Sequence, residues 1–219
     1  MREQDFIPHS GRFSTLHEKW NIGPRNRHHW YNASTEFATR HLGDGNGRSC
    51  LVIGSPIFEA KALQDKGWDI TYLDIRRPPV IIGKFILCDA TDINLEDESF
   101  DAVSSACVLT HAGTGRYGDK TNNPHGDEQM LSHIARVMKS GGMAAITFGA
   151  VADIQRMTVI GNLHRVYTVP ECERMLAAAS LKVGEMKVWG KKKSGWLETT
   201  DAITQNINSP DYISFMVTK

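Results

Sequence analysis

The sequence has no surplus of either charge, because its 25 lysines and arginines balance its 25 aspartates and glutamates. A chain without net charge has no global field that draws it to nucleic acid or to an anionic membrane, so we expect neither as a partner. No apolar run approaches the length that spans a bilayer, and residues 1–30 lack the apolar stretch of a signal peptide. We therefore expect a cytoplasmic protein.

Cysteine is also scarce. The four cysteines, Cys50, Cys88, Cys107 and Cys172, lie far apart and form no C-x-x-C pair. This spacing argues against a disulfide framework and against a structural zinc site. What remains is a chain of ordinary globular composition, and its 219 residues are enough to bury a core without such cross-links.

Short apolar runs alternate with amphipathic stretches from residue 50 to about residue 180. We predict strands at 50–54, 69–74, 85–88, 100–108, 143–148, 181–189 and 212–217. We predict helices at 31–42, from a cap at Ser55 to Gly67, from a cap at Asp127 to Gly141-Gly142, and from a capping box at Thr168 to Ser180. This order predicts an α/β, doubly wound, Rossmann-like fold with a mostly parallel seven-stranded sheet and an antiparallel last strand. Residues 1–48 would form an N-terminal extension or lid, and residues 49–219 the ligand-binding domain.

Ligands of doubly wound sheets lie beyond the carboxyl ends of the strands. Gly54 ends the first predicted strand, and Asp74 ends the second, twenty residues later, at the spacing of an acid that binds ribose hydroxyls. The next strand ends at Asp89, and the fourth reaches Ser105 and Cys107. The candidate cofactor-binding residues are Gly54, Ser55, Asp74, Asp89, Ala90, Ser105 and Cys107.

Five segments together resemble the successive motifs of class I S-adenosylmethionine-dependent methyltransferases. They are Leu51–Gly54, Thr71–Arg76, Leu87–Thr91, Asp97–Ser105 and Val137–Gly142. The resemblance implies S-adenosylmethionine as cofactor, with Gly54 under its methionine part, Asp74 on the ribose, and Asp89 with Ala90 beside the adenine.

The first motif departs from the family pattern, which has an acid before a three-glycine loop. Val52 stands where the acid is usual, and Ser55–Phe58 replaces the later glycines. Such a loss would be severe for a dinucleotide enzyme, because the glycines allow the backbone to approach a pyrophosphate. S-adenosylmethionine has no pyrophosphate, so the change is less severe for a methyltransferase.

A long glycine-rich loop, His111–Asp119, follows the fourth strand, and long loops in compact domains are usually functional. Its HxGxGRYGD pattern resembles a poorly characterised methyltransferase-like branch that is associated with sugar and glycan metabolism. We predict that His111 is the general base, and that Asp119 orients it or serves instead. The alternative for His111 is a hydrogen bond to loop backbone. The predicted substrate-binding residues are Arg116, Tyr117, His164 and Arg165.

Four possible metal ligands crowd the same loop, namely His111, Asp119, His125 and Asp127. Their spacing matches no established metal motif, so we assign no metal to the site. For Asp127 the expected role is the helix cap.

The leading hypothesis is therefore methyl transfer from S-adenosylmethionine to a small polar acceptor, sugar-like or nucleotide-like, at oxygen or nitrogen. A methyltransferase-fold binding module without catalysis is the first alternative, and the altered first motif favours it. A nicotinamide-dependent oxidoreductase is the second, although a lone Gly54 cannot cradle a pyrophosphate. A nucleic-acid methyltransferase ranks below these, because the charge balance offers no footprint for a phosphate backbone.

Overall fold

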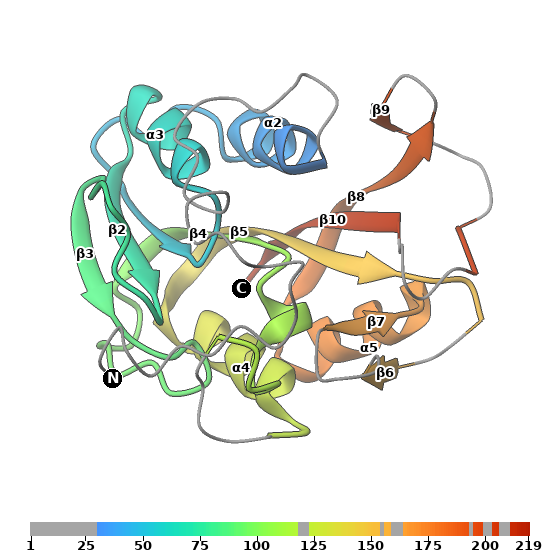
Figure 1. Ribbon diagram of the computed structural model, residues 1–219. Helices are drawn as coiled ribbons and strands as arrows, with labels where there is room; N and C mark the ends of the chain where they lie inside the picture. The colour runs from blue at the N-terminus through green and yellow to red at the C-terminus, as the bar shows by residue number, and fades with distance from the viewer. Residues whose placement is uncertain are drawn as a thin grey trace.

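The computed structural model describes residues 30–117, 123–153, 156–158, 164–192, 195–198, 203–205 and 211–219, and these residues are organised around one mixed sheet (Figure 1). Its main strands are β1 (Ser49–Ile53), β2 (Asp69–Asp74), β3 (Lys84–Leu87), β4 (Phe100–Ala106), β5 (Met138–Ala150), β8 (Lys182–Lys192), β9 (Gly195–Glu198) and β10 (Asp211–Thr218). They lie in the order β3-β2-β1-β4-β5-β10-β8-β9. Strands β1 to β5 pair in parallel, and β10 is antiparallel to both β5 and β8. The predicted parallel sheet with an antiparallel last strand is confirmed.

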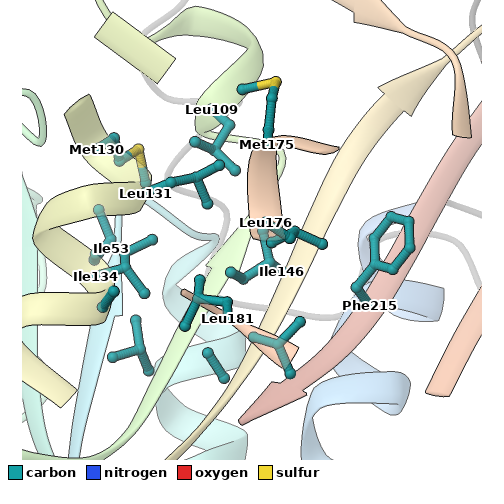
Figure 2. Packing of buried hydrophobic residues seen from close by; sticks show 14 of the residues in the cluster. Ile53, Leu109, Met130, Leu131, Ile134, Ile146, Met175, Leu176, Leu181 and Phe215 are labelled. Atoms are coloured by element: carbon teal, nitrogen blue, oxygen red, sulfur yellow. The ribbon is translucent and has the colours of Figure 1, made fainter. Parts of the chain in front are cut away.

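Helices cover both faces of this sheet. Helices α2 (Trp30–Leu42) and α3 (Ile57–Asp65) lie together on one face, and α4 (Gly126–Val137) and α5 (Val169–Ala178) lie on the other. Figure 2 shows the second face, where Met130 and Ile134 of α4 and Leu176 of α5 pack against Ile146 and Phe215 of the sheet. These α4 residues follow the helical spacing of the apolar stripe. Each such buried side chain contributes about 1.5–3 kcal/mol to folding.

Three predicted boundary signals act differently in the structure. Helix α3 begins after Pro56 without a side-chain cap, so Ser55 is not the cap that we predicted. Asp127 is not the cap of α4 either, because the helix begins at Gly126 after His125. The Gly141-Gly142 pair lies inside β5 rather than ending the helix, which already stops where Met138 turns to an extended conformation and pairs with Phe100.

Helix α2 packs within the same core as the sheet. Its residues Phe37, Ala38 and Leu42 are buried with Val52 and Tyr72. The division at residues 48 and 49 stays a prediction, but this helix shares a core with the residues that follow it. No helix in the described ranges is both long and apolar enough to cross a membrane.

A small hairpin beside the main sheet was not predicted. Strands β6 (Arg156–Thr158) and β7 (Arg165–Tyr167) pair antiparallel, and β7 also pairs with the end of β5. Three-residue strands are too short to show a periodic pattern. The hairpin brings Arg165 and Tyr167 beside the first turn of α4, where they contact Asp127.

The Asp101 carboxylate links the amino-terminal ends of β1, β4 and β5. These ends lie at the edge of the sheet opposite the carboxyl ends of the strands. The carboxylate accepts hydrogen bonds from the Ser49 backbone N–H at 2.9 Å, the Ser49 hydroxyl at 2.7 Å and the Lys139 ammonium at 2.8 Å. Burial raises the pKa of Asp101, but these hydrogen bonds outweigh it and hold the pKa at about 2. The folded state therefore favours the charged carboxylate.

We expect Asp101→Asn to lower the free energy of unfolding by about 1–2 kcal/mol at neutral pH, because it weakens charge-assisted hydrogen bonds. The folded-state pKa lies below the ordinary value of 3.8, so the contribution is complete above that value and is lost as the pH falls toward about 2. Urea denaturation of both proteins at several pH values measures this. The difference should shrink with acidification, and Glu98→Gln, at an exposed acid, should change stability by less than about 0.5 kcal/mol. Equal losses in the two variants would contradict the role of Asp101.

Candidate functional site

A pocket lies at the carboxyl ends of β1, β2 and β4. Its volume is about 570 Å³, including space open to solvent at the mouth. It is lined by Tyr31, Ile53, Gly54, Leu73, Asp74, Ile75, Cys88, Asp89, Ala90, Ala106, Cys107, Val108, His111, Ala112, Gly113 and Tyr117. The structure thus brings five of the seven candidate cofactor-binding residues to one cavity with four residues of the loop His111–Asp119, among them the predicted site residues His111 and Tyr117.

Gly54 forms the turn at the end of β1. Its φ of 53° lies in the left-handed region, where glycine is least strained. A Cβ atom at this position would come within 3.0 Å of the Val108 side chain, which also lines the pocket. A side chain at Gly54 would therefore press on Val108 at the pocket lining.

Ser55 supports this turn from below and does not line the pocket. The Tyr72 hydroxyl donates a 2.6 Å hydrogen bond to the Ser55 carbonyl, and the Ala106 N–H donates a 2.8 Å hydrogen bond to the Ser55 hydroxyl oxygen. These two bonds fix the turn after β1 to the neighbouring strands β2 and β4.

A fully buried carboxyl, that of Glu59 on α3, lies on the same side of the sheet. It accepts hydrogen bonds from the Ser104 hydroxyl at 2.8 Å and from the Thr35 hydroxyl of α2 at 3.1 Å. Burial raises the pKa of Glu59, and the hydrogen bonds oppose that rise. Ser104 pairs with Val52, the position where the family usually has its acid. The carboxyl of Glu59 therefore lies beside the pair formed by β1 and β4, and β1 itself lacks the acid that the family usually has there.

Asp74 and Asp89 supply the carboxylates of the pocket lining, at the ends of the neighbouring strands β2 and β3. One oxygen of Asp74 accepts a 2.9 Å hydrogen bond from the Arg76 N–H. One oxygen of Asp89 accepts hydrogen bonds from the N–H and the hydroxyl of Thr91, at 2.8 and 2.9 Å. Each carboxylate is therefore held by its own strand end and presents an acidic edge to the cavity.

The end of β4 carries Cys107 in a left-handed conformation, with a φ of 60°. Such a conformation is strained for a residue with a side chain, and strain of this kind is concentrated at functional sites. Burial raises the pKa of Cys107 to about 12, so its side chain is a neutral thiol. Ser105 is buried outside the pocket lining, and its hydroxyl has no hydrogen-bond partner among the described residues.

His111 and Arg116 form a pair on the loop after β4. An Arg116 guanidinium nitrogen lies 3.2 Å from Nδ1 of His111. A guanidinium can only donate, so Nδ1 is the acceptor, and neutral His111 carries its proton on Nε2. This fixes which ring nitrogen can act on a ligand.

Tyr117 connects this loop to the end of β2. The guanidinium of Arg76 lies 4.3 Å from the centre of the Tyr117 ring, and that of Arg116 lies 5.3 Å from it. The His111 ring meets Tyr117 edge-on at 5.4 Å. Contacts of this type contribute about 0.5–2 kcal/mol each. Arg76 was not among the predicted site residues, although its place two residues after Asp74 was a possible signal.

Arg165 is almost fully buried under the loop, at 2% exposure, and does not line the pocket. Its guanidinium donates to the carbonyls of Ala112 and Asn123, the two sides of the loop's base, and lies 3.8 Å from the buried carboxylate of Asp127. The Tyr167 hydroxyl donates a 2.8 Å hydrogen bond to the same carboxylate. His164 also lies outside the lining, so substrate binding by these two residues stays a prediction.

Two of the possible metal ligands of the loop make other contacts. Asp127 binds Tyr167 and lies near Arg165, and the exposed His125 lies 2.9 Å from Glu128. Asp119 is outside the described residues, as is the part of the proposed lid before residue 30. Within the described part of the chain, no three His, Cys, Asp or Glu side chains come together as a metal site.

Comparisons with known proteins agree with this geometry. Residues 53–146 match the family described as methyltransferase domain. No curated protein is similar enough in sequence to be recognised as a relative.

Several solved structures share the fold. The 1,6-didemethyltoxoflavin-N1-methyltransferase of Burkholderia thailandensis, with bound S-adenosylhomocysteine, superposes with a TM-score of 0.65 at 16% identity, over 86% of this chain and 77% of that one. The cyclase SpnF gives 0.62 at 15% identity, over 92% and 85% of the two chains. A methyltransferase of Methanosarcina mazei, named as dependent on S-adenosylmethionine, gives 0.56 at 14% identity, over 82% and 96%.

At these identities the neighbours establish the fold, and the family match identifies the domain. The match favours methyl transfer over the nicotinamide-dependent alternative. The pocket fits such a cofactor, because glycine leaves room beneath it and two carboxylates line one side. Residues 53–146 therefore match a methyltransferase domain, and the chain has the fold of S-adenosylmethionine-dependent methyltransferases.

Proposed function

We propose that the strand ends bind S-adenosylmethionine in the order that the sequence motifs imply. Gly54 lies beneath the methionine part, Asp74 accepts hydrogen bonds from the ribose, and Asp89 with Ala90 borders the adenine. Cys107, at the end of β4, then lies near the sulfonium. The bound cofactor supplies an electrophilic methyl group, and the support for this order is that all five residues line one pocket.

We further propose that the acceptor is a small polar molecule, sugar-like or nucleotide-like, methylated at oxygen or nitrogen. The observation that carries this proposal is that a single cavity is lined both by the strand ends and by the loop residues His111 and Tyr117. A methyl transfer requires its two reactants in line and close together, which a shared cavity provides. The Burkholderia neighbour, whose structure holds 1,6-didemethyltoxoflavin with S-adenosylhomocysteine, supports an acceptor of this size.

His111 is the loop residue that we place beside the acceptor, with Arg116 and Tyr117 behind it. A general-base role for His111 would require its lone pair at Nδ1, which accepts from Arg116 in the structure. Asp119 stays a second candidate base. Arg165 acts on this site by fixing the base of the loop through Ala112 and Asn123.

We expect Asp74→Ala to weaken S-adenosylhomocysteine binding at least tenfold, or about 1.4 kcal/mol, because it removes the acceptor for the ribose hydroxyls. Calorimetric titration of the purified protein measures this. Asp92→Ala, at an exposed acid outside the lining, is the matched control and should bind normally. Unchanged affinity in Asp74→Ala would contradict the ribose assignment, and absence of binding by the unmodified protein would contradict the cofactor site.

Gly54→Ala should also weaken S-adenosylhomocysteine binding at least tenfold, because the new methyl group would occupy the turn beneath the ligand and press on Val108. Gly141→Ala is its control, since Gly141 has a φ of 75° but no atom within 4 Å of an added Cβ. Both changes carry backbone strain of about 1–2 kcal/mol, visible as a lower melting temperature. Only Gly54→Ala should lose affinity, and equal affinities in the two variants would rule out close approach at Gly54.

His111→Ala should lower kcat by about 100-fold with an accepted substrate, because the side chain that positions the acceptor is lost, while S-adenosylhomocysteine affinity stays within about twofold. The assay measures S-adenosylhomocysteine release across a panel of sugars, nucleosides and nucleobases. His125→Ala, at an exposed histidine of the same loop, is the control and should retain full turnover. Full turnover by His111→Ala would remove His111 from the acceptor site, and no turnover with any panel member would contradict the proposed acceptor class.

A further inference from the structure

Resting on the proposed function, we infer that Tyr31 of α2 covers the part of the bound cofactor that lies above Gly54, and that the buried hydrogen bond between Thr35 and Glu59 positions it there. Tyr31 is then a binding residue that contacts the cofactor. Thr35 and Glu59 are positioning residues, because they act on the cofactor only through Tyr31.

Tyr31 reaches the pocket from a helix that lies outside the sheet. It is in the first turn of α2, which lies with α3 on one face of the sheet, and it lines the cavity together with Gly54 (Figure 1). Its ring meets the Phe58 ring edge-on, with the ring centres 6.5 Å apart. Phe58 is in the first turn of α3, a few residues after Gly54. Tyr31 therefore lies near the end of β1, within reach of a cofactor bound above Gly54.

The two halves of α2 are held in different ways. Toward the carboxyl end, Phe37 and Leu42 are buried in an apolar cluster with residues of the sheet. Nearer the amino-terminal end, the helix is held by a polar contact, because the Thr35 hydroxyl donates a 3.1 Å hydrogen bond to the Glu59 carboxyl. Side chains four residues apart lie on the same side of a helix, so Thr35 and Tyr31 point the same way. The bond to Glu59 therefore holds the helix one turn away from Tyr31.

Glu59 itself is held by more than this one bond. It is fully buried, and the Ser104 hydroxyl of β4 donates to its other oxygen at 2.8 Å. Burial raises the pKa of Glu59, and the hydroxyls of Ser104, Ser55 and Thr35 oppose that rise. One carboxyl thus contacts β4, the turn after β1 and α2, and each of these carries residues of the pocket lining. A hydrogen bond in such a low-dielectric place is stronger than in water, so its loss should release the amino-terminal half of α2.

The test removes the hydroxyl that binds Glu59 and measures S-adenosylhomocysteine affinity by calorimetric titration. Thr35→Val keeps the shape of the side chain and should weaken binding about fivefold or more, because Tyr31 is no longer held over the site. Thr35→Ala removes the same hydroxyl while favouring the helix, and it should match Thr35→Val. Thr35→Ser keeps the hydroxyl and should restore affinity to within about twofold of the unmodified protein.

Thr39→Val is the matched control on the same helix. The Thr39 hydroxyl donates to backbone carbonyls of α2 itself, at Thr35 and Glu36, and the substitution should leave S-adenosylhomocysteine affinity within about twofold. An equal loss of affinity in Thr39→Val and Thr35→Val would overturn the inference, because the effect would then come from the helix in general.

A double-mutant cycle tests whether Thr35 acts through Tyr31. Tyr31→Ala alone should weaken S-adenosylhomocysteine binding about fivefold or more, but by less than about twofold in a protein that already carries Thr35→Val. A network that only stabilises the fold would lower the melting temperature without this non-additive loss of affinity. Losses that simply add would show that Thr35 does not act through Tyr31 and would overturn the inference.

The unmodified protein is titrated in parallel, so the failure of the cofactor site is seen separately. If it binds S-adenosylhomocysteine and neither Tyr31→Ala nor Thr35→Val changes the affinity, the inference is wrong while the cofactor site stands. If the unmodified protein does not bind the ligand, the cofactor site and the inference are both wrong.

Discussion

The turn that follows β1 is the constraint on which the site depends. Class I methyltransferases commonly use several glycines here, and this chain keeps Gly54 alone. Hydrogen bonds hold the turn in place instead. The Tyr72 hydroxyl donates to the Ser55 carbonyl, and the Ala106 N–H donates to the Ser55 hydroxyl oxygen. Because two neighbouring strands hold the turn, the sheet sets its backbone conformation and fewer glycines are needed there.

The buried carboxyl of Glu59 extends the same support. It joins α3 to Ser104 of β4 and to Thr35 of α2, and α2 also carries Tyr31 to the pocket. A fully buried polar network is stabilising only when its members are satisfied, and here hydroxyls from two elements serve both carboxyl oxygens. The carboxyl of Glu59 thus ties α3 to β4 and α2, on the side of the sheet away from α4 and α5.

Most of the fold could be predicted from the sequence, because apolar periodicity and turn residues are local signals. The strand ends at Gly54, Asp74 and Asp89 were reached by the same argument, since parallel strands place their carboxyl ends at one edge. The roles of Ser55 and Arg165 could not be predicted. Ser55 faces a backbone N–H of a strand about fifty residues away, and Arg165 reaches the loop only through the β6–β7 hairpin. Such contacts depend on how the strands are paired and produce no periodic pattern in the sequence.

The loop after β4 is fixed at its base more firmly than its glycine content suggests. A buried ion pair such as Arg165–Asp127 contributes little net stability when its desolvation cost is counted, but loss of one partner leaves an uncompensated charge. Its main effect is therefore on geometry, because the Arg165 guanidinium can serve Ala112 and Asn123 together only when the two sides of the base are correctly spaced. Close packing enforces the same spacing, since a Cβ atom on Gly126 would lie 2.7 Å from the Ala112 carbonyl oxygen.

Because the base of the loop after β4 is fixed, Tyr117 is held where it contacts two arginines. The ring contacts Arg76, whose own N–H binds Asp74, and it also contacts Arg116, which binds His111. One side chain thus joins the end of β2 to the loop after β4, so the positions of Asp74 and His111 in the pocket lining are set together.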